Sequence, residues 1–380
     1  MALRILIVGE YSAYGRNLKL GFEKLGHNAS LITMGDGYRK ILSSESDFKL
    51  RGGNFSISGI QFKGSWIIRN YFVFCKLKRR LLKNIGCYDY ILILNYEFVT
   101  NNKYSKTLRI PLDWLIKLLK PEGRIFLAAC GNDLPYYEYA KELRYWPYQS
   151  VKNLKKNNKY YSDSFIRTFN KTLGIISGVI PSAFEYAYAY RRYFSEHSIS
   201  DIPVYQSQYF PMMIDNNYKP NIISSKIVIF HGLTREIDKG TNYIREAFKE
   251  ISEKYPDETE FIIEGGMPLD SYLQFMDSVD IVVDQTSAYG YGMNAVFALM
   301  KGKTVLSGNE PETQVEYNNY QIPVINILPD AKQISKVLED LIMSRGMITE
   351  ISEKSRKFTE QFHSCEKVAE SYLEIFRSSL

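Results

Sequence analysis

Apolar and polar positions along the first half of the chain follow two alternating patterns. Short runs rich in β-branched residues predict strands, and the stretches between them, with apolar residues three or four positions apart, predict helices. The predicted strands are residues 3–8, 30–34, 90–95, 124–129 and 175–180, and two of the predicted helices are residues 17–25 and 111–119. Because strands that alternate with helices need crossover connections, this half predicts a mainly parallel sheet.

The pattern stops around residues 210–220, where two prolines bracket a polar segment, and it then restarts. This break predicts a linker. Beyond it the predicted strands are residues 226–230, 260–263, 280–283, 304–307 and 323–327, and the predicted helices are residues 241–255 and 293–300. The chain therefore predicts two α/β domains in tandem. Ligands of such sheets bind outside the carboxyl ends of the strands, so the loops after the strands are the candidate site.

Composition narrows the class of protein. The 380 residues are 45% hydrophobic and 24% charged, which excludes an intrinsically disordered chain. No apolar run approaches the ~20 residues that a transmembrane helix needs, and the first residues lack the features of a signal peptide. The cysteines and histidines are scattered without metal-ligand spacing, which favours reduced thiols in a cytoplasmic protein and argues against structural zinc.

The net charge of +6 conceals opposite charges on the two halves. Residues 1–210 hold 31 Lys and Arg against 16 Asp and Glu, whereas residues 211–380 hold 17 against 26. This contrast indicates two domains with different surroundings. A basic half attracts nucleic acid, anionic lipid or an acidic substrate, and charge alone does not choose among them.

Two loops that follow predicted strands carry candidate chemistry. The first places Arg235 and Lys239 just before a helix, where cations and unpaired backbone N–H groups together suit a diphosphate. The second places Gly290 and Gly292 at a strand-to-helix turn, which lets a phosphate approach the backbone closely. Each loop also has a purely structural interpretation, as a solvated turn or as a turn that needs glycine.

These loops belong to a longer resemblance. Five motifs carry this resemblance. They are Arg235 together with residues 239–241, the loop at residues 264–268, Asp280 together with residues 284–285, residues 290–292, and residues 302–308. Together, residues 227–312 resemble the nucleotide-sugar-binding domain of GT-B glycosyltransferases, in particular retaining enzymes of the family-4 type. The first half is similar more loosely, at residues 9–15, 25–27 and 131–133, and residues 362–363 resemble the start of the family's last helix.

The resemblance implies a fold and a set of roles. It implies two Rossmann-like domains facing across a cleft, an acceptor domain at 1–210 and a donor domain at 211–361, with a C-terminal helix at 362–380 that crosses back to the first domain. Arg235 and Lys239 are expected to hold the leaving nucleoside diphosphate. The expected donor-binding residues are Gly265, Gly266, Met267, Gly290, Tyr291, Gly292, Met293 and Glu312, and the expected acceptor-binding residues are Gly9, Tyr11, Gly15 and Asn132.

Asp133 has two interpretations. It follows a predicted strand of the acceptor half, where its carboxylate suits the orientation of an acceptor hydroxyl and so a catalytic role. Asp is also a preferred helix N-cap residue, which is the structural alternative.

The sequence departs from the family at two positions. The family carries two glutamates eight residues apart around the loop that contains Gly290 and Gly292. One glutamate contacts the sugar and the other contacts the ribose. In this sequence Tyr289 and Phe297 occupy those two positions. Loss of such a buried contact typically costs ~1–3 kcal/mol. Three interpretations follow from this departure: another residue supplies the contact, the donor binds differently, or catalysis is lost. Glu264, Glu310 and Glu312 are the candidate replacements.

Residues 66–85 predict a basic amphipathic helix, a type that can lie in a membrane interface. Its apolar positions are Ile67, Tyr71, Phe74, Leu81 and Ile85, and its cations are Lys76, Arg79, Arg80 and Lys83. Residues 144–159 add aromatic and basic side chains. The alternative is a helix packed on its own sheet with a solvated cationic face.

The leading hypothesis is a cytoplasmic glycosyltransferase, peripheral on the inner face of the membrane, that acts in cell-surface polysaccharide assembly. It takes a nucleotide-diphosphate sugar and a saccharide or lipid-linked acceptor, and the resemblance implies retention of configuration without a metal or cofactor. A non-catalytic GT-B module that binds a glycan or protein is the alternative. A nucleic-acid binder is disfavoured, because recognition motifs are absent and the second half is acidic.

Overall fold

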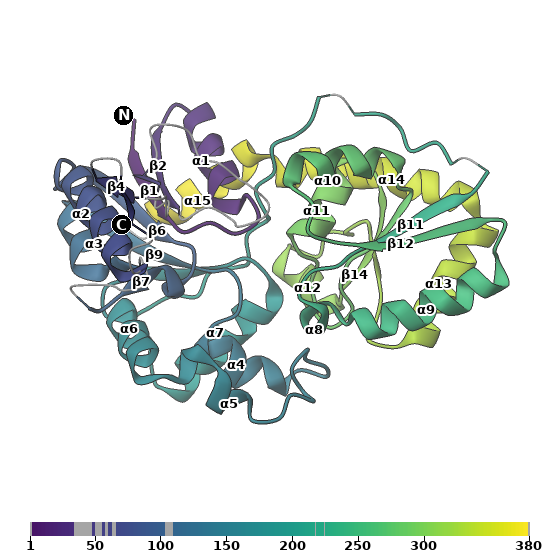
Figure 1. Ribbon diagram of the computed structural model, residues 1–380, viewed down its shortest axis with the longest axis horizontal. Coiled ribbons are helices and arrows are strands. Elements are labelled where there is room, and N and C mark those ends of the chain that lie inside the picture. The colour runs from purple at the N-terminus through teal and green to yellow at the C-terminus, as the bar shows by residue number, and fades with distance from the viewer. Residues whose placement is uncertain are drawn as a thin grey trace.

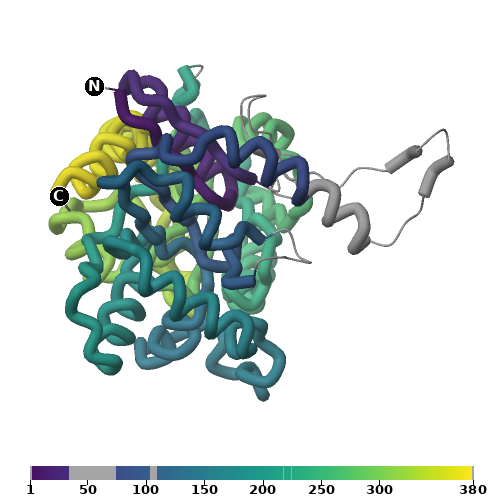
Figure 2. Tube along the Cα trace, turned by 90° about the vertical axis from the view of Figure 1, so that its left-hand side faces the viewer, coloured from purple at the N-terminus to yellow at the C-terminus, as the bar shows by residue number. Residues whose placement is uncertain are grey.

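The computed structural model consists of two parallel β-sheets, each accompanied by helices, which lie side by side (Figure 1). It describes residues 2–33, 48–49, 55–57, 60–62, 66–102, 109–216, 218–223 and 225–378. The expected α/β class with two Rossmann-like halves is therefore confirmed. Both ends of the described chain lie on the half formed by the first sheet (Figures 1 and 2).

The first sheet has the strand order β10-β9-β6-β1-β2-β3, and all neighbours are parallel. Its strands are β1 (Arg4–Val8), β2 (Asn28–Thr33), β3 (Phe48–Lys49), β6 (Tyr88–Ile93), β9 (Leu119–Ala129) and β10 (Gly178–Pro181). Alternate residues of β1 enter different hydrophobic clusters, Ile5 and Ile7 on one face and Leu6 and Val8 on the other. Burial on both faces is what a parallel sheet covered by crossover helices requires.

The other elements of the first half are short strands and crossover helices. The strands are β4 (Phe55–Ile57), β5 (Ile60–Phe62), β7 (Val99–Thr100) and β8 (Ile110–Pro111). The helices are α1 (Tyr14–Lys24), α2 (Trp66–Leu82), α3 (Leu112–Leu118), α4 (Leu134–Tyr139), α5 (Leu154–Asn157), α6 (Asp163–Leu173) and α7 (Phe184–Glu196), with short turns η2 (Tyr96–Phe98), η3 (Ala140–Glu142) and η4 (Lys159–Tyr161).

Over residues 74–82, where its side chains are described, helix α2 packs apolar side chains inside the protein. Phe74 and Leu81 are buried, and the Phe74 ring lies 4.5 Å from the Trp114 ring, centroid to centroid. The prediction that Ile85 shares this face is wrong, because the helix ends at Leu82 and Ile85 is 53% exposed. The side chains of Ile67 and Tyr71 lie outside the described residues, as does Met34 at the end of a predicted strand.

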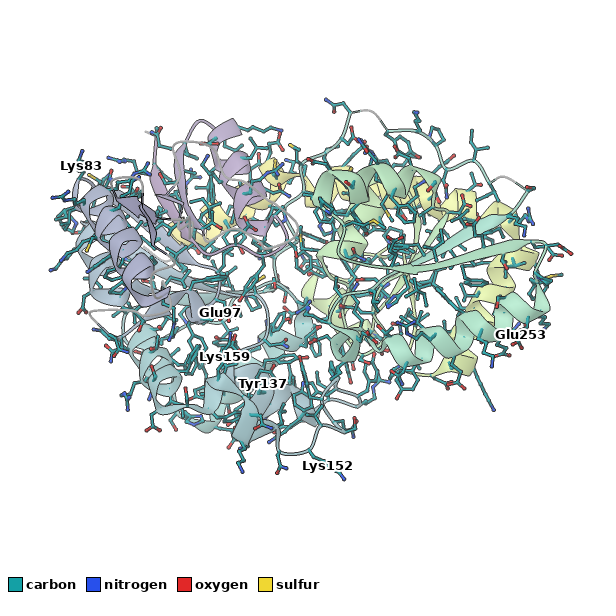
Figure 3. The ribbon with its side chains drawn as sticks, in the orientation of Figure 1. Lys83, Glu97, Tyr137, Lys152, Lys159 and Glu253 are labelled. Atoms are coloured by element: carbon teal, nitrogen blue, oxygen red, sulfur yellow. The ribbon has the colours of Figure 1, made fainter. Side chains whose placement is uncertain are left out.

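The cations predicted on α2 are exposed. Lys76, Arg79 and Arg80 face solvent, as does Lys83 just beyond the end of the helix, and Lys83 points away from the molecule in Figure 3. None of the helices in the described ranges is both long and apolar enough to cross a membrane.

The second sheet has the order β12-β11-β13-β14-β15 and is again parallel throughout. Its strands are β11 (Ile227–Gly232), β12 (Thr259–Glu264), β13 (Ile281–Val283), β14 (Thr304–Ser307) and β15 (Val324–Asn326). The helices between them are α8 (Glu236–Lys239), α9 (Thr241–Lys254), α10 (Leu269–Phe275), η5 (Met276–Ser278), α11 (Met293–Met300), α12 (Pro311–Glu316) and α13 (Ala331–Met343).

The last helices return the chain to the first sheet. After α14 (Arg345–Phe358) and the π-helical turn η6 (Thr359–His363), α15 (Cys365–Ser378) packs along α1 (Figure 1). A Cβ atom on Gly21 of α1 would lie 2.0 Å from the Cys365 carbonyl oxygen, so only glycine permits this approach. The Phe376 ring stacks on Tyr90 of β6, with centroids 4.7 Å apart. The expected helix that crosses back to the first domain is thus confirmed.

Candidate functional site

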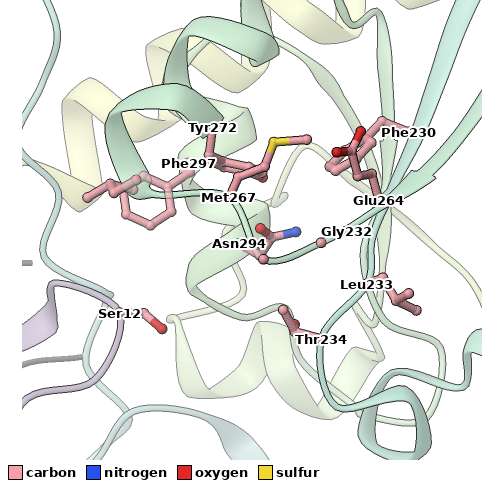
Figure 4. Close-up of a pocket in the computed structure, with 13 residues that line it drawn as sticks. Ser12, Phe230, Gly232, Leu233, Thr234, Glu264, Met267, Tyr272, Asn294 and Phe297 are labelled. Carbon is pink, nitrogen blue, oxygen red and sulfur yellow. The ribbon is translucent and has the colours of Figure 1, made fainter. Parts of the chain in front are cut away.

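A pocket lies at the carboxyl ends of β11 and β12, where the fold class predicts a ligand (Figure 4). It is open to solvent, and the space unfilled by protein atoms is about 520 Å³ when the adjoining solvent is included. Its lining residues are Phe230, Gly232, Leu233, Thr234, Glu264, Gly265, Gly266, Met267, Leu269, Tyr272, Asn294 and Phe297, together with Ser12 from the first half.

Two adjacent loops shape the floor of this pocket. The Leu233 amide donates to the Glu264 carbonyl oxygen at 2.8 Å, which joins the loop after β11 to the loop after β12. A Cβ atom on Gly265 would lie 2.0 Å from the Leu233 carbonyl oxygen, so only glycine fits there. The expected donor residues Gly265, Gly266 and Met267 all line the pocket.

Arg235 adjoins the pocket and is uncommitted in the sense that it forms no hydrogen bond or ion pair among the described residues, although its charge interacts with that of Asp238. It follows the lining residue Thr234 and has a backbone φ of 49°, an uncommon left-handed conformation for a residue with a side chain. Its side chain is exposed and has no hydrogen bond or ion pair within the described part of the chain. An exposed guanidinium held by a strained turn is well placed to meet an anionic ligand.

Lys239, by contrast, is committed to a partner inside the protein. Its ammonium donates to Asp284 Oδ1 at 2.7 Å and to the Gly232 carbonyl oxygen at 3.1 Å, and both charged side chains are buried. Burial alone would raise the pKa of Asp284, but the neighbouring Lys239 and the Asn294 amide hold that pKa below its ordinary value. Lys239 therefore anchors the loop to β13, and Arg235 is the cation that stays available.

The buried histidines are structural supports. His231 Nδ1 donates to the Val283 carbonyl oxygen at 2.8 Å, and its Nε2 accepts from the Thr241 hydroxyl. Burial, and then the charge of Lys239, lower the pKa of His231 to about 4. His363 donates to the Phe210 carbonyl oxygen, and burial lowers its pKa likewise to about 4. Both rings are neutral at pH 7.

The loop at residues 289–293 does not line the pocket. Tyr291 is buried in the core, where its hydroxyl donates to His363 Nε2 at 3.0 Å. The Gly290 carbonyl oxygen accepts from the Gln285 amide, and Gly292 and Met293 begin α11 beside the pocket residue Asn294. The loop therefore meets the pocket only through the chain neighbour Asn294.

The two positions where the sequence departs from the family have different surroundings. Phe297 forms part of the pocket wall. Tyr289 lies outside the pocket, where its hydroxyl oxygen accepts from the Arg144 amide at 3.0 Å and its ring packs against Phe184 and Tyr145.

The three candidate replacement glutamates also differ. Glu310 accepts from Arg144, from the Tyr145 hydroxyl at 2.9 Å and from Asn326 at 2.9 Å. Glu312 lies on α12, 4.0 Å from the Arg144 guanidinium, and does not line the pocket. Glu264 alone of the three lines it.

Residues 144–148, hereafter the strap, join the first half to the second. Arg144 and Tyr145 reach Glu310, as above, and the Tyr148 hydroxyl donates to Asp238 of α8. Asn132 donates to the same Asp238 oxygen at 3.1 Å, so an expected acceptor residue also contacts the Arg235 loop. The sequence analysis missed these contacts, because nothing in the spacing of residues 144–148 pairs them with residues about 90–165 positions away.

One expected acceptor residue, Tyr11, contacts a carboxylate that the sequence did not single out. Glu97 accepts from the hydroxyls of Tyr11 and Tyr160 and from the ammonium of Lys159 (Figure 3). A usable signal existed, because Glu97 closely follows a predicted strand. Gly9 has a φ of 110°, and a Cβ there would overlap the Phe98 ring at 2.2 Å. A Cβ on Gly15 would approach the Gly9 carbonyl oxygen at 2.8 Å, so both glycines are required by packing.

Asp133 is the N-cap residue of α4, which is the structural alternative given above. Its Oδ1 accepts from the Tyr136 amide at 3.0 Å and its Oδ2 accepts from the Tyr190 hydroxyl at 2.7 Å. The side chain is 1% exposed, and burial raises the pKa of its carboxyl to about 7 although both hydrogen bonds lower it. Among the described residues, no group of three or more His, Cys, Asp or Glu is placed to hold a metal ion.

No protein-family model matches the chain, and no curated protein sequence matches it. Solved structures do match over nearly its whole length. Sucrose-phosphate synthase from Thermosynechococcus elongatus has a TM-score of 0.62 at 11% identity, covering 99% of this chain and 98% of that one. Anabaena HepE in complex with UDP and glucose has a TM-score of 0.58 at 13% identity, with 99% and 100% covered. WaaG, a glycosyltransferase involved in lipopolysaccharide biosynthesis, has a TM-score of 0.55 at 11% identity, with 98% and 99% covered.

These likenesses identify the architecture. The chain has the GT-B fold of glycosyltransferases, with two Rossmann-like sheets and a last helix that returns to the first. The resemblance drawn from the motifs is thereby confirmed at the level of the fold.

Proposed function

We propose that the protein is a glycosyltransferase that moves a sugar from a nucleoside-diphosphate sugar to a saccharide or lipid-linked acceptor. The observation that carries this proposal is the pocket at the carboxyl ends of β11 and β12 with the uncommitted Arg235 beside it. The structural neighbour HepE binds UDP and glucose, which supports a donor of this class. The diphosphate lies against Arg235 and the backbone at the start of α11, and the nucleoside occupies the pocket.

Arg235 supplies the main electrostatic contribution in this proposal. As the bond between sugar and diphosphate breaks, negative charge grows on the leaving oxygen, and a guanidinium already in place stabilises it without reorganisation. We include retention of anomeric configuration and independence from a metal ion in the proposal. We assign acceptor binding to the first half, at Asn132 and at the Glu97 cluster, which consists of Glu97 with Tyr11, Lys159 and Tyr160. Synthesis of a cell-surface polysaccharide is the proposed setting.

Isothermal titration calorimetry with UDP-, GDP-, ADP- and TDP-sugars tests the donor class. We expect micromolar uptake of at least one member of the panel, with an affinity that falls about tenfold or more in Arg235→Ala because a charge-assisted hydrogen bond is lost. No heat with any of the four would contradict a nucleotide-sugar site.

A non-catalytic GT-B module is the second candidate function. Two observations favour it: Lys239 is engaged by Asp284, and Tyr289 is engaged by the strap. Measuring the release of nucleoside diphosphate distinguishes an enzyme from a non-catalytic module. An enzyme releases free nucleoside diphosphate from its donor when acceptor is present, or slowly by hydrolysis, whereas a binding module takes up the sugar nucleotide and leaves it intact.

We further propose a cytoplasmic protein that contacts the inner face of the membrane through α2. The packing of Phe74 and Leu81 inside the protein means that this contact rests on the exposed cations and on Leu82 and Ile85, which are 46% and 53% exposed. Such a surface suits reversible attachment to anionic lipid.

A further inference from the structure

Glu264 ends β12 with a carboxylate that the protein does not use. The side chain is exposed at the edge of the pocket and has no hydrogen-bond or ion-pair partner among the residues that the structure describes. Two other acids of the second half are engaged: Asp284 with Lys239, and Glu310 with Arg144. Glu264 therefore differs from them in being available to a ligand.

The pocket around Glu264 is otherwise largely apolar. Phe230, Met267, Tyr272 and Phe297 form its walls, and in the view of Figure 4 Glu264 lies across from Phe297 with Met267 between them. The amide nitrogen of the lining residue Asn294 is already directed to Asp284. Glu264 is the one acid among the lining residues, so it is the strongest hydrogen-bond acceptor that a ligand meets there.

The charges of Glu264 in the pocket and of Arg235 next to it favour one direction of a bound nucleotide. A carboxylate repels phosphate, whereas Arg235, which directly follows the lining residue Thr234 in the chain, attracts it. A nucleoside diphosphate therefore binds with its phosphates toward Arg235 and its nucleoside toward Glu264. An ionised carboxylate only accepts hydrogen bonds, so the part of the nucleoside that it meets must offer O–H or N–H donors.

We propose that Glu264 is the specificity-determining residue of the donor site, accepting hydrogen bonds from paired donors of the nucleoside. This inference rests on the proposed function. Two sources offer such donors: the vicinal hydroxyls of the ribose, and the N–H edge of the base. The assignment also gives the pocket an acceptor that Phe297, as an apolar wall, does not provide.

The test compares wild type with Glu264→Gln by calorimetry, using UDP, GDP and ADP and their 2′-deoxy forms. Removing a negative charge beside an anionic ligand should tighten binding if Glu264 makes no contact. A loss is therefore diagnostic, and we expect the tightest-binding member to lose about tenfold or more. Glu260→Gln is the matched control, since Glu260 is exposed on the same strand, and it should bind as wild type does.

The deoxy forms distinguish the two sources. If ribose is read, the wild type prefers the ribonucleotide and Glu264→Gln loses that preference. If Glu264 instead contacts the base, the affinities for the ribonucleotide and for its 2′-deoxy form fall by the same factor in Glu264→Gln. Unchanged or tighter binding in Glu264→Gln overturns this assignment alone. Absence of binding to wild type across these six compounds and TDP overturns it together with the proposed function.

Discussion

Arg235 and Lys239 stand four positions apart in one loop and yet have different surroundings. The sequence assigns both to the diphosphate, but the structure commits the Lys239 ammonium to Asp284 and leaves Arg235 exposed. The spacing of the two residues could not reveal this difference, because the partner Asp284 lies 45 residues further along the chain, directly after β13. Substitutions of Arg235 and of Lys239 should therefore have different effects.

We expect Lys239→Ala to destabilise the fold and Arg235→Ala to leave it stable. Truncating one member of a buried ion pair leaves the other charge uncompensated, which costs about 3–5 kcal/mol. Urea denaturation measures the free energy of unfolding, with Lys249→Ala on the exposed side of α9 as the control. Equal stability of Lys239→Ala and the control would show that the Lys239–Asp284 contact is not formed.

Asp133 gives a prediction about pH. Its carboxyl ionises near pH 7 in the folded protein because burial raises the pKa, against an ordinary value of 3.8 in the unfolded chain. The folded state keeps a proton that the unfolded state releases, so this residue's contribution to stability is present below about pH 4 and is lost as pH rises to 7.

Asp133→Asn should therefore gain stability relative to wild type as the pH rises from 4 to 7. The relative gain is at most about 4 kcal/mol, from a shift of roughly three pKa units. Chemical denaturation of both proteins at several pH values measures it. A constant difference between the two proteins across this range would mean that Asp133 is ionised in the fold.

At the scale of helices and strands, the hydrophobic pattern predicted most of what positions the site. Strand β14 and helix α11 match their predicted ranges, and the ends of α9 differ by one residue at most. Strand β9 starts five residues earlier than predicted, at Leu119, because Tyr88 pairs with it across an irregularity in the register. Periodicity reports burial within one element, so it could not predict the strap or the Glu97 cluster, which depend on contacts between distant segments.

The strap predicts a change in proteolysis. Arg144→Ala combined with Tyr148→Phe removes contacts to Glu310 and Asp238, so residues 143–157 should open more often. Trypsin should then cut after Lys152, Lys155 or Lys156 several times faster than in wild type. Arg192→Ala, which loses ion pairs only within its own half, is the control. Equal cleavage rates in all three proteins would argue against a strap that holds the halves together.

Helix α2 predicts salt-sensitive attachment to anionic liposomes. Each cation near an anionic leaflet contributes ~1 kcal/mol, so four of them suffice for reversible sedimentation that added salt abolishes. Reversal to Glu at Lys76, Arg79, Arg80 and Lys83 should eliminate sedimentation and leave nucleotide binding intact.

The matched control for this experiment reverses four exposed lysines of the second half, namely Lys249, Lys332, Lys354 and Lys357. This variant should still sediment with anionic liposomes. If the α2 variant also sediments like wild type, the cations of α2 form only a solvated surface.

At the scale of the whole molecule, two parallel sheets and one returning helix bring distant residues to a single pocket. Ser12 from the first half lines it together with residues of β11, β12 and α11 from the second. Helix α15 packs on α1 and the first sheet through Gly21 and Phe376 and so fixes where that half lies. The alternation of strands and helices predicted this architecture, whereas the lining of the pocket emerges only when the loops meet.

Hydrogen–deuterium exchange with and without the tightest-binding nucleoside diphosphate tests the central claim most directly, because it locates the bound nucleotide on the chain. We predict slower exchange in peptides that cover residues 230–235, 264–272 and 292–297, with a smaller change in Arg235→Ala at a ligand concentration near the wild-type Kd. Binding that slows exchange elsewhere and leaves these three segments unchanged would contradict the assignment of the pocket as the donor site.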